Sequence, residues 1–276
     1  MKRFLRHYRA LISMMGGMTL LLVTFGVSAQ TLFLDGFESG DRSASQNNIR
    51  WILPGGNISI NSLRPHTGSY AMEFRFPAKP DGQDSSAEQR IALGASYTDL
   101  WIKYDFYVPT NYYHRTQSGP ANNKFFAIYR NPYTNPGFQV NFSTQRNGNG
   151  GSHLEIHTQD NGREAPVQSP SSARNFLTSA DAGRWHNLIL HIKVPTGQST
   201  NDGVMQLWKN GTQIVNLTNL ASWGGTGQNY MDEAYILGWS NSGYSNETVF
   251  YVDNFEVSNT PLGVNPPAAP PVLTVE

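Results

Sequence analysis

Apolar and polar residues alternate at every second position through much of the chain, and this alternation constrains the fold more than any other feature. The clearest case is the segment 100–108. One set of alternate positions holds Leu100, Ile102, Tyr104, Phe106 and Val108. The other set holds Trp101, Lys103, Asp105 and Tyr107. Because successive side chains of a strand point to opposite faces, the segment is predicted to be a strand with one buried face.

Similar alternation predicts further strands over residues 138–143, 154–159, 185–194, 204–209, 234–239 and 249–257. Asn210-Gly211, between Trp208 and Ile214, is a strong hairpin signal. Helical periodicity is nearly absent. Ten or more antiparallel strands in one domain indicate two stacked sheets, so we expect an all-β, two-sheet antiparallel sandwich.

The first 29 residues have the features of a signal peptide. They begin with the cations Lys2, Arg3, Arg6 and Arg9. An apolar run over residues 14–27 follows, and Val27-Ser28-Ala29 supplies the small residues that a signal peptidase reads. The alternative is an uncleaved membrane anchor, but the run is shorter than the roughly 20 residues needed to span a bilayer. We therefore expect cleavage after Ala29.

The remaining chain is predicted to hold one β domain, residues 30–258, and a proline-rich tail, residues 259–276, that is disordered or a linker. The sequence contains no cysteine, which excludes disulfides and thiolate metal sites. Export without cysteine fits a bacterial-type route better than a eukaryotic one, so we expect a secreted or periplasmic protein.

Charge limits the partners that this chain can have. Twenty Lys and Arg balance 20 Asp and Glu, so no broad cationic face is expected, and neither nucleic acid nor a membrane surface is an expected partner. The second face of several strands is polar but rich in aromatic residues. That composition suits a concave sheet that accepts a ligand, or an ordinary solvated face decorated with Tyr and Trp.

Several segments together resemble a known family. They are residues 33–40 (FLDGFESG), 64–71 (RPHTGSYA), 87–90 (AEQR), 185–186 (WH), 202–211 (DGVMQLWKNG) and 251–257 (YVDNFEV). In this order they resemble concanavalin A-like jelly rolls, in particular secreted polysaccharide lyases of the heparinase I, alginate lyase and glucuronan lyase type. The resemblance covers Thr31 to Ser258 and implies a jelly-roll sandwich. The opening and closing segments also occur in non-catalytic sugar-binding modules.

The resemblance implies β-elimination on an acidic, uronate polysaccharide. This reaction needs a group that holds the carboxylate, a base and an acid. By likeness to alginate lyases, Arg90 would bind the carboxylate and His157 would be the base, although Glu155 stands where those enzymes have Gln. Tyr235 or Tyr244 would be the acid. The alternative is a lectin-like module that binds polysaccharide without cleaving it.

A second cluster suits an acidic sugar, because cations can meet a carboxylate and rings can stack on a pyranose. It comprises Tyr112, Tyr113, His114 and Arg115, followed by Lys124. The alternative is a rigid loop whose aromatic residues cover a sheet edge. The full set of expected substrate-binding residues is Arg90, Lys103, Tyr107, His114, Arg115, Lys124, Asn141 and Trp239.

Two other chemistries fail at the residue level. A glycoside hydrolase on this fold needs two converging carboxylates, but His157 occupies the position two residues after Glu155, and Asp160 falls on the opposite face. A zinc site at His153 and His157 is also excluded, because four residues on a strand separate them by roughly 13 Å.

Structural Ca²⁺ is the one expected cofactor. Glu38 and Asp41 lie near the first strand and Asp253 lies on the last, so pairing of the terminal strands would bring them together. Asp253 is expected to point inward with Val249, Tyr251 and Phe255, where a carboxylate needs a partner. An arginine or backbone partner in place of the ion is the alternative.

Overall fold

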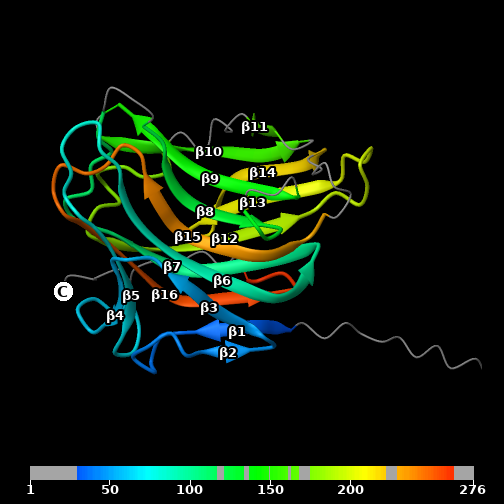
Figure 1. Cartoon of the computed structure of the whole chain (residues 1–276), viewed down its shortest axis with the longest axis horizontal. Coiled ribbons are helices and arrows are strands. Elements are labelled where there is room, and N and C mark those ends of the chain that lie inside the picture. The colour runs from blue at the N-terminus through cyan, green and yellow to red at the C-terminus, as the bar shows by residue number, and fades with distance from the viewer. Residues whose placement is uncertain are drawn as a thin grey trace, which may run out of the picture.

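The computed structural model describes residues 30–116, 121–133, 137–148, 150–160, 163–167, 175–221 and 229–263. Two antiparallel sheets of eight strands each form a sandwich that runs from Thr31 to Ser258 (Figure 1). The predicted signal peptide lies outside the described residues, as does most of the proline-rich tail. Within the described residues, no helix is both long and apolar enough to cross a bilayer.

The first sheet, sheet A, contains the strands at both ends of the described chain. Its neighbouring strands are, in order, β14 (Thr212–Leu220), β13 (Gly203–Lys209), β12 (Arg184–Lys193), β7 (Asp99–Val108), β16 (Thr248–Ser258), β5 (Ala71–Phe76) and β4 (Ile58–Asn61). β1 (Thr31–Asp35) also pairs with β16, so the first and last strands lie side by side.

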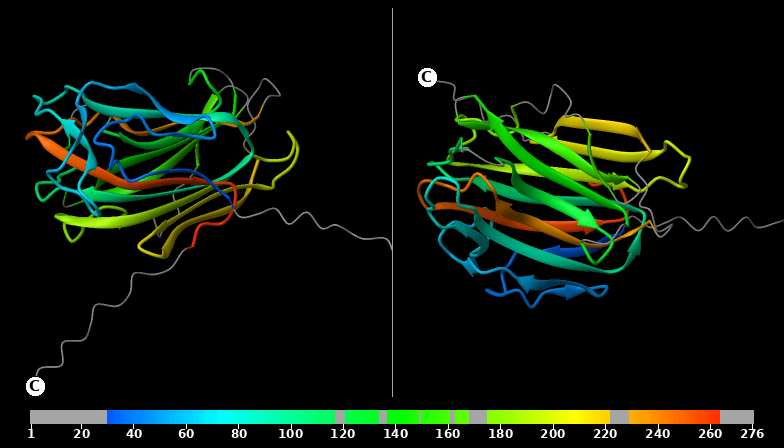
Figure 2. Two further views of the ribbon diagram at one scale, coloured as in Figure 1. Left: turned by 90° about the horizontal axis from the view of Figure 1, so that it is seen from below. Right: turned by 45° about the horizontal axis from the view of Figure 1, so that its top comes forward.

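The second sheet, sheet B, is stacked on sheet A (Figure 2). Its order is β11 (Arg163–Val167), β10 (Gly151–Asp160), β9 (Gln139–Asn147), β8 (Asn123–Tyr129), β15 (Met231–Ser240), β6 (Ser85–Tyr97), β3 (Ile49–Pro54) and β2 (Ser45–Gln46). β15 is inserted between β8 and β6, and the chain repeatedly crosses from one sheet to the other. The predicted all-β jelly-roll sandwich is therefore confirmed.

The core lies between the sheets and follows the predicted alternation. In β7, the predicted apolar set is buried, and in β9 and β10 the inward side chains belong to Val140, Phe142, Leu154 and Ile156. The predicted hairpin joins β13 to β14. Asn210 and Gly211 have φ values of 51° and 75°, which the mirror-image turns of two-residue hairpins require.

An aromatic cluster joins the two sheets at the strands that open and close the sandwich. The Trp51 ring, from sheet B, packs against Phe33, Phe37 and Phe255, with centroid separations of 5.8, 5.8 and 4.9 Å. Its indole N–H donates a 2.7 Å hydrogen bond to the Asp35 carboxylate, which also accepts the Phe37 backbone N–H. Burial raises the pKa of Asp35, and these two hydrogen bonds act against that shift.

We expect Trp51→Ala to lower the free energy of unfolding by about 3–5 kcal/mol, because it removes a buried ring and the indole donor to Asp35 Oδ2. Urea denaturation followed by circular dichroism measures the change. Leu34→Ala is the control, since Leu34 on β1 is 58% exposed and its truncation should alter stability by less than about 0.5 kcal/mol. Equal losses in the two variants would contradict this account of the cluster.

Candidate functional site

Four of the predicted site residues lie in one line across five adjacent strands of sheet B, on the face turned away from the core. In the strand register, Arg90 of β6 pairs with Tyr235 of β15, which pairs with Ala127 of β8. Ala127 pairs with Asn141 of β9, and Asn141 pairs with His157 of β10. We call these five residues the central row. At 4.7–4.9 Å between strands, the row is roughly 19 Å long.

The middle of the central row is covered by tyrosines. The rings of Tyr129, Tyr133 and Tyr235 pack on one another above the small side chain of Ala127, with centroids 5.0 to 6.1 Å apart. The Tyr133 hydroxyl donates to Asn141 Oδ1 at 3.2 Å, and the Tyr235 hydroxyl lies 3.5 Å from the same oxygen. Tyr133 comes from the segment after β8 and was not singled out in the sequence, because it belongs to no strand pattern.

The Tyr235 hydroxyl is suited to donating a proton. Burial raises its pKa well above the ordinary value, and the nearby hydroxyl of Tyr133 raises it further. The group therefore stays protonated at neutral pH, as an acid must before it acts.

Arg90 is already engaged by two carboxylates. Its Nε lies 2.6 Å from Glu88, and its Nη1 lies 3.3 Å from Glu233. Burial lowers the pKa of Arg90, but the hydrogen bond and charge of Glu88 outweigh that effect and the net shift is upward. Glu233 also accepts a 2.5 Å hydrogen bond from the Tyr129 hydroxyl. The guanidinium is thus permanently charged, and its charge is balanced within the protein.

Lys124 of β8 lies near Glu88. Its ammonium group forms no hydrogen bond or ion pair with the described residues. Gly238 lies between Glu88 and Lys124. A Cβ at position 238 would lie 3.2 Å from Glu88 Oε2 and from Lys124 Cβ, and 3.5 Å from the Tyr235 ring. Its φ of +134° also favours glycine, so β15 passes between these side chains only because position 238 has no side chain.

β9 presents unpartnered polar groups on the same face. Gln139, Asn141 and Ser143 occupy alternate positions and are buried. Within the described chain, Gln139 Oε1, Asn141 Nδ2 and Ser143 Oγ have no hydrogen-bond partner. A buried polar group without a partner costs about 1–3 kcal/mol, so three on one face of one strand mark a surface arranged for a ligand.

On β10, Glu155 lies between two histidines. Its Oε2 is 3.4 Å from His157 Nε2, and its Oε1 is 3.3 Å from His153 Nε2. Gln145 of β9 also donates to Glu155, at 3.1 Å. Glu155 therefore orients the His157 ring and places a negative charge next to the central row.

Comparison with known proteins identifies the family and the fold. A sequence profile of the family described as polysaccharide lyase matches residues 37–256. The chain belongs to the polysaccharide lyase family. No curated protein sequence matches it.

Solved structures show the same fold at low identity. The alginate lyase Aly36B superposes with a TM-score of 0.55 at 12% identity, covering 74% of this chain and 86% of its own. The alginate lyase vAL-1 from Chlorella virus gives 0.51 at 10% identity, covering 74% and 93%. The cellulose induced protein Cip1 gives 0.53 at 16% identity, covering 83% and 98%. The predicted resemblance to jelly-roll polysaccharide lyases is confirmed, and the protein is polysaccharide lyase-like.

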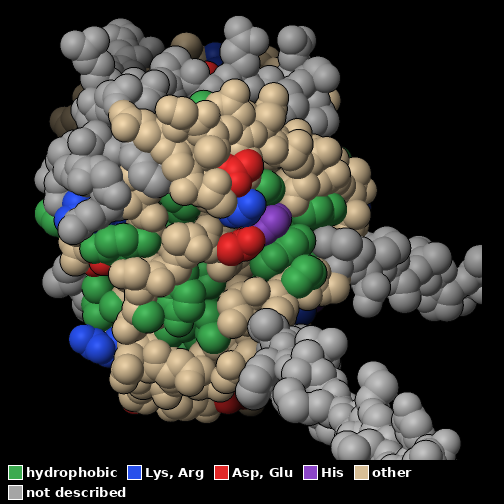
Figure 3. All heavy atoms as spheres, turned by 90° about the vertical axis from the view of Figure 1, so that its right-hand side faces the viewer, with side chains coloured by type: hydrophobic (Ala, Val, Ile, Leu, Met, Phe, Trp, Pro, Cys, Tyr) green, Lys and Arg blue, Asp and Glu red, His purple; other side chains and the backbone are tan. Residues whose placement is uncertain are grey.

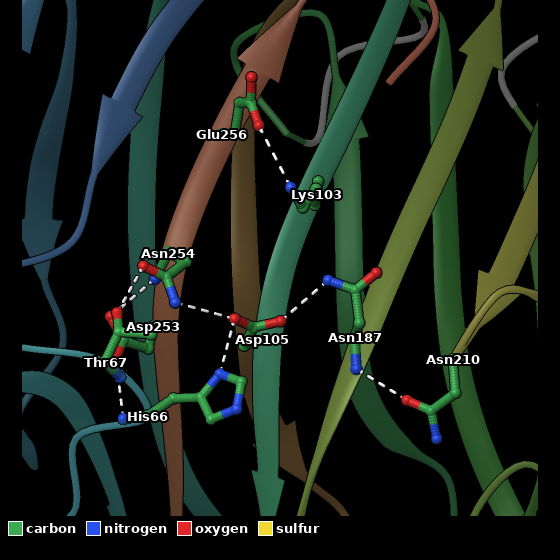
Figure 4. A network of polar contacts seen from close by, with 9 residues as sticks. All are labelled: His66, Thr67, Lys103, Asp105, Asn187, Asn210, Asp253, Asn254 and Glu256. Atoms are coloured by element: carbon green, nitrogen blue, oxygen red, sulfur yellow. Dashed lines mark hydrogen bonds and ion pairs between the residues drawn. The ribbon is translucent and has the colours of Figure 1, made fainter. Parts of the chain in front are cut away.

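Two predicted substrate contacts, Lys103 and Tyr107, lie on the opposite sheet from the central row. Lys103 and Tyr107 point outward from β7, which belongs to sheet A, so they face away from the central row. Lys103 pairs with Glu256 at 3.6 Å (Figure 4), and the Arg64 guanidinium covers the Tyr107 ring at 4.5 Å. The alternation in 100–108 was interpreted correctly, but alternation cannot tell which of two sheets a strand joins.

His114 and Arg115 are structural rather than substrate-facing, which corrects a second prediction. His114 is fully buried, with its ring nitrogens 2.7 Å from Ser152 Oγ and 2.6 Å from the Ala121 carbonyl oxygen. Arg115 donates to the backbone carbonyls of Ser242, Lys79 and Pro80. Both side chains therefore tie loops to the sandwich.

The two remaining aromatic candidates, Tyr244 and Trp239, differ in exposure to solvent. Tyr244 packs in the core against Phe76 and Phe250, and burial raises its pKa well above the usual value. It cannot reach a polysaccharide, which leaves Tyr235 as the candidate acid. Trp239 of β15 is 55% exposed and pairs with Ser86 of β6, so it remains available for contact with a sugar.

The three residues predicted to bind Ca²⁺ do not form one site. Glu38 accepts the backbone N–H groups of Ser69 and Tyr70, and Asp41 bonds to Ser39 and Ser43. Asp253 accepts the backbone N–H groups of residues 66, 67 and 254, in the network of Figure 4. Backbone donors hold Glu38 and Asp253, serines hold Asp41 Oδ1, and the three carboxylates are not grouped around one point, so the residues present do not fit a shared cation.

No group of three or more His, Asp or Glu side chains in the described parts of the chain is placed to hold a metal ion. Asp253 instead has backbone partners, which were the predicted alternative to an ion. Sequence reasoning placed its side chain with those of Val249 and Tyr251, but that face is the outer side of sheet A, where the loop at residues 66 and 67 covers the carboxylate.

One flank of the molecule illustrates the balance of charge. Figure 3 shows basic, acidic and histidine side chains next to one another on that flank, with uncharged side chains around them. The described part of the flank carries no continuous basic patch. This view agrees with the equal numbers of cations and anions in the sequence.

We expect the buried His114 to make the protein less stable in mild acid. Burial lowers its pKa to about 4, below the ordinary value of 6.5, so the unfolded chain binds its proton first. The contribution of neutral His114 to the free energy of unfolding is therefore fully present above about pH 6.5. It falls by up to about 3 kcal/mol as the pH drops to 4. Urea titrations across this range should show a smaller pH dependence in His114→Gln than in the parent protein, and an unchanged slope would contradict the assignment.

Proposed function

We propose that this lyase-family protein cleaves a uronate-containing polysaccharide by β-elimination on the outer face of sheet B. The observation that carries the proposal is the central row, which brings Arg90, Tyr235, Asn141 and His157 into register. Membership of the polysaccharide lyase family supports the reaction class. A fold neighbour, the alginate lyase Aly36B, is described in complex with an alginate trisaccharide, which supports an acidic sugar as substrate.

The proposed step uses two protein groups. The His157 imidazole takes the proton from the carbon next to the uronate carboxylate. The electron pair left behind forms a carbon–carbon double bond as the glycosidic carbon–oxygen bond breaks. The Tyr235 hydroxyl gives its proton to the departing sugar oxygen, so the protein gains one proton and loses one. Asn141 lies between these groups, in contact distance of Tyr235 and paired with His157.

Negative charge that develops on the uronate carboxylate must be stabilised. Asn141 Nδ2 is an unpartnered donor among the described residues, and Lys124 is an uncommitted cation. We assign the carboxylate to these two groups. Arg90 was the contact expected from the sequence, but its charge is already shared between Glu88 and Glu233. Its proposed role is to position those carboxylates beside Tyr235.

Export is part of the same proposal, since a polysaccharide of this class is met outside the cytoplasm. It rests on the charged start, the apolar run and the Val27-Ser28-Ala29 sequence. Recovery of the protein from the medium or periplasm, with Gln30 as its first residue, is the expected result of expression in a bacterium. Recovery of the full-length chain in the cytoplasm would contradict it.

We expect His157→Ala and Tyr235→Phe each to reduce cleavage by about 10²–10⁴-fold, the usual contribution of a general acid or base. The readout is the ultraviolet absorbance of the new conjugated double bond, measured with glucuronan, alginate, pectate and heparin. His191→Ala is the matched control, because His191 lies on the outer face of sheet A, paired with Asp99. Binding to a polymer without any product would instead favour a lectin-like module.

Lys124 and Lys103 provide a second matched pair. We expect Lys124→Ala to raise KM by roughly 10-fold to 100-fold, because a hydrogen bond to a charged group contributes about 1.5–3 kcal/mol. Lys103→Ala should leave KM unchanged, since Lys103 lies on sheet A. Equal effects of the two substitutions in steady-state assays would contradict the assignment of the carboxylate to Lys124.

A further inference from the structure

The central row is flanked by two shorter rows that carry most of the charge near it. On one side, Glu233, Tyr129 and Gln139 are paired across β15, β8 and β9. On the other side, Lys124, Ser143 and Glu155 are paired across β8, β9 and β10. Glu88 lies next to Lys124, over Gly238. We call these the Gln139 row and the Ser143 row.

Permanent charges around Lys124 and Asn141 are mainly negative. The carboxylates are Glu88, Glu155 and Glu233, and the permanent cations are Arg90 and Lys124. Arg50 of β3 is a further cation on this face, but it lies two strands beyond Glu233, in register through Ala92. Arg90 is bound by two of the carboxylates. Lys124 is therefore the one uncommitted permanent cation among the described side chains of these rows, and one cation can balance one substrate carboxylate.

The positions on either side of Asn141 offer neutral groups. Gln139 Oε1 and Ser143 Oγ are buried and have no partner among the described residues. Each is two residues from Asn141 along β9, at roughly 7 Å. A sugar hydroxyl can donate to Gln139 Oε1 and can exchange a hydrogen bond with Ser143 Oγ. A carboxylate over Gln139 Oε1 would instead face an acceptor oxygen, and at either position a carboxylate of the protein, Glu233 or Glu155, lies in the same row.

From this arrangement we infer that the substrate carries isolated uronates flanked by neutral sugars, rather than a carboxylate on every residue. The inference rests on the proposed function, because it concerns the same face of sheet B. One uronate lies over Lys124 and Asn141, and its neutral neighbours avoid the surrounding carboxylates. Gln139 and Ser143 contact hydroxyl groups and set the preference for uncharged substituents.

The test varies charge and keeps the glycosidic linkage fixed. Native glucuronan and alginate are compared with the same polymers after part of their carboxylates has been reduced to primary alcohols. Binding is measured at low salt with His157→Ala, so that no cleavage intervenes. We expect the partly reduced polymers to bind about 10-fold more tightly, a factor worth about 1.4 kcal/mol, and added salt to narrow the difference by screening the repulsion.

A substitution in the Ser143 row sharpens the test. In the His157→Ala background, Glu155→Gln should tighten binding of the native polymers more than that of the reduced ones, because it removes one repelling charge. Asp99→Asn is the matched control, because it removes a carboxylate from the outer face of sheet A, next to His191. It should leave the affinities for the native and for the reduced polymers unchanged.

The outcomes separate this inference from the proposed reaction. Tighter binding of the fully charged polymers, with affinity falling as salt is added, would overturn the inference while leaving the reaction intact. Preferred binding of the reduced polymers with no product from the parent protein would overturn the reaction and uphold the inference. Absence of binding to every polymer would overturn both.

Discussion

The long strands of this protein bury one face between two sheets, and that constraint places the side chains of the central row. Because the side-chain period is two, a strand whose inward residues are fixed by the core has no freedom in its outward ones. On β9, burial of Val140 and Phe142 forces Gln139, Asn141 and Ser143 outward. The same argument on β10 directs His157 to that face, and the pairing of β9 with β10 places it beside Asn141.

The two outer faces differ in how completely their polar groups are satisfied. On sheet A, Asp105 accepts hydrogen bonds from His66, Asn187 and Asn254, each at 2.8 Å (Figure 4). Aromatic rings on that face are also covered by neighbours, as Trp185 is by His66 and Trp101 is by His191. On sheet B, buried donors and acceptors along β9 lack partners among the described residues. The unsatisfied groups, more than the aromatic content, distinguish a ligand surface from a stable exterior.

The same face of sheet B has an unusual charge arrangement for the proposed acidic substrate. Glu88 and Glu233 bind Arg90, so in the proposed site the balancing charge is assigned to Lys124. Proton transfer is assigned to uncharged or weakly basic groups, Tyr235 and His157. In the proposed reaction, affinity and chemistry are thereby separated: Lys124 binds one carboxylate, while burial under the tyrosine cover raises the pKa of Tyr235 and favours its protonated form.

The sequence by itself determined the strand pattern, the Asn210-Gly211 hairpin and the family, because these are encoded in local alternation, turn residues and ordered segments. It also named Arg90, Asn141, His157 and Tyr235. It could not place Lys103 on the opposite sheet, bury His114, or find Tyr133 above the central row. Those outcomes depend on which strands pair and on how loops fold back over them. Such pairings join residues far apart in the chain, and only the packed sandwich fixes them.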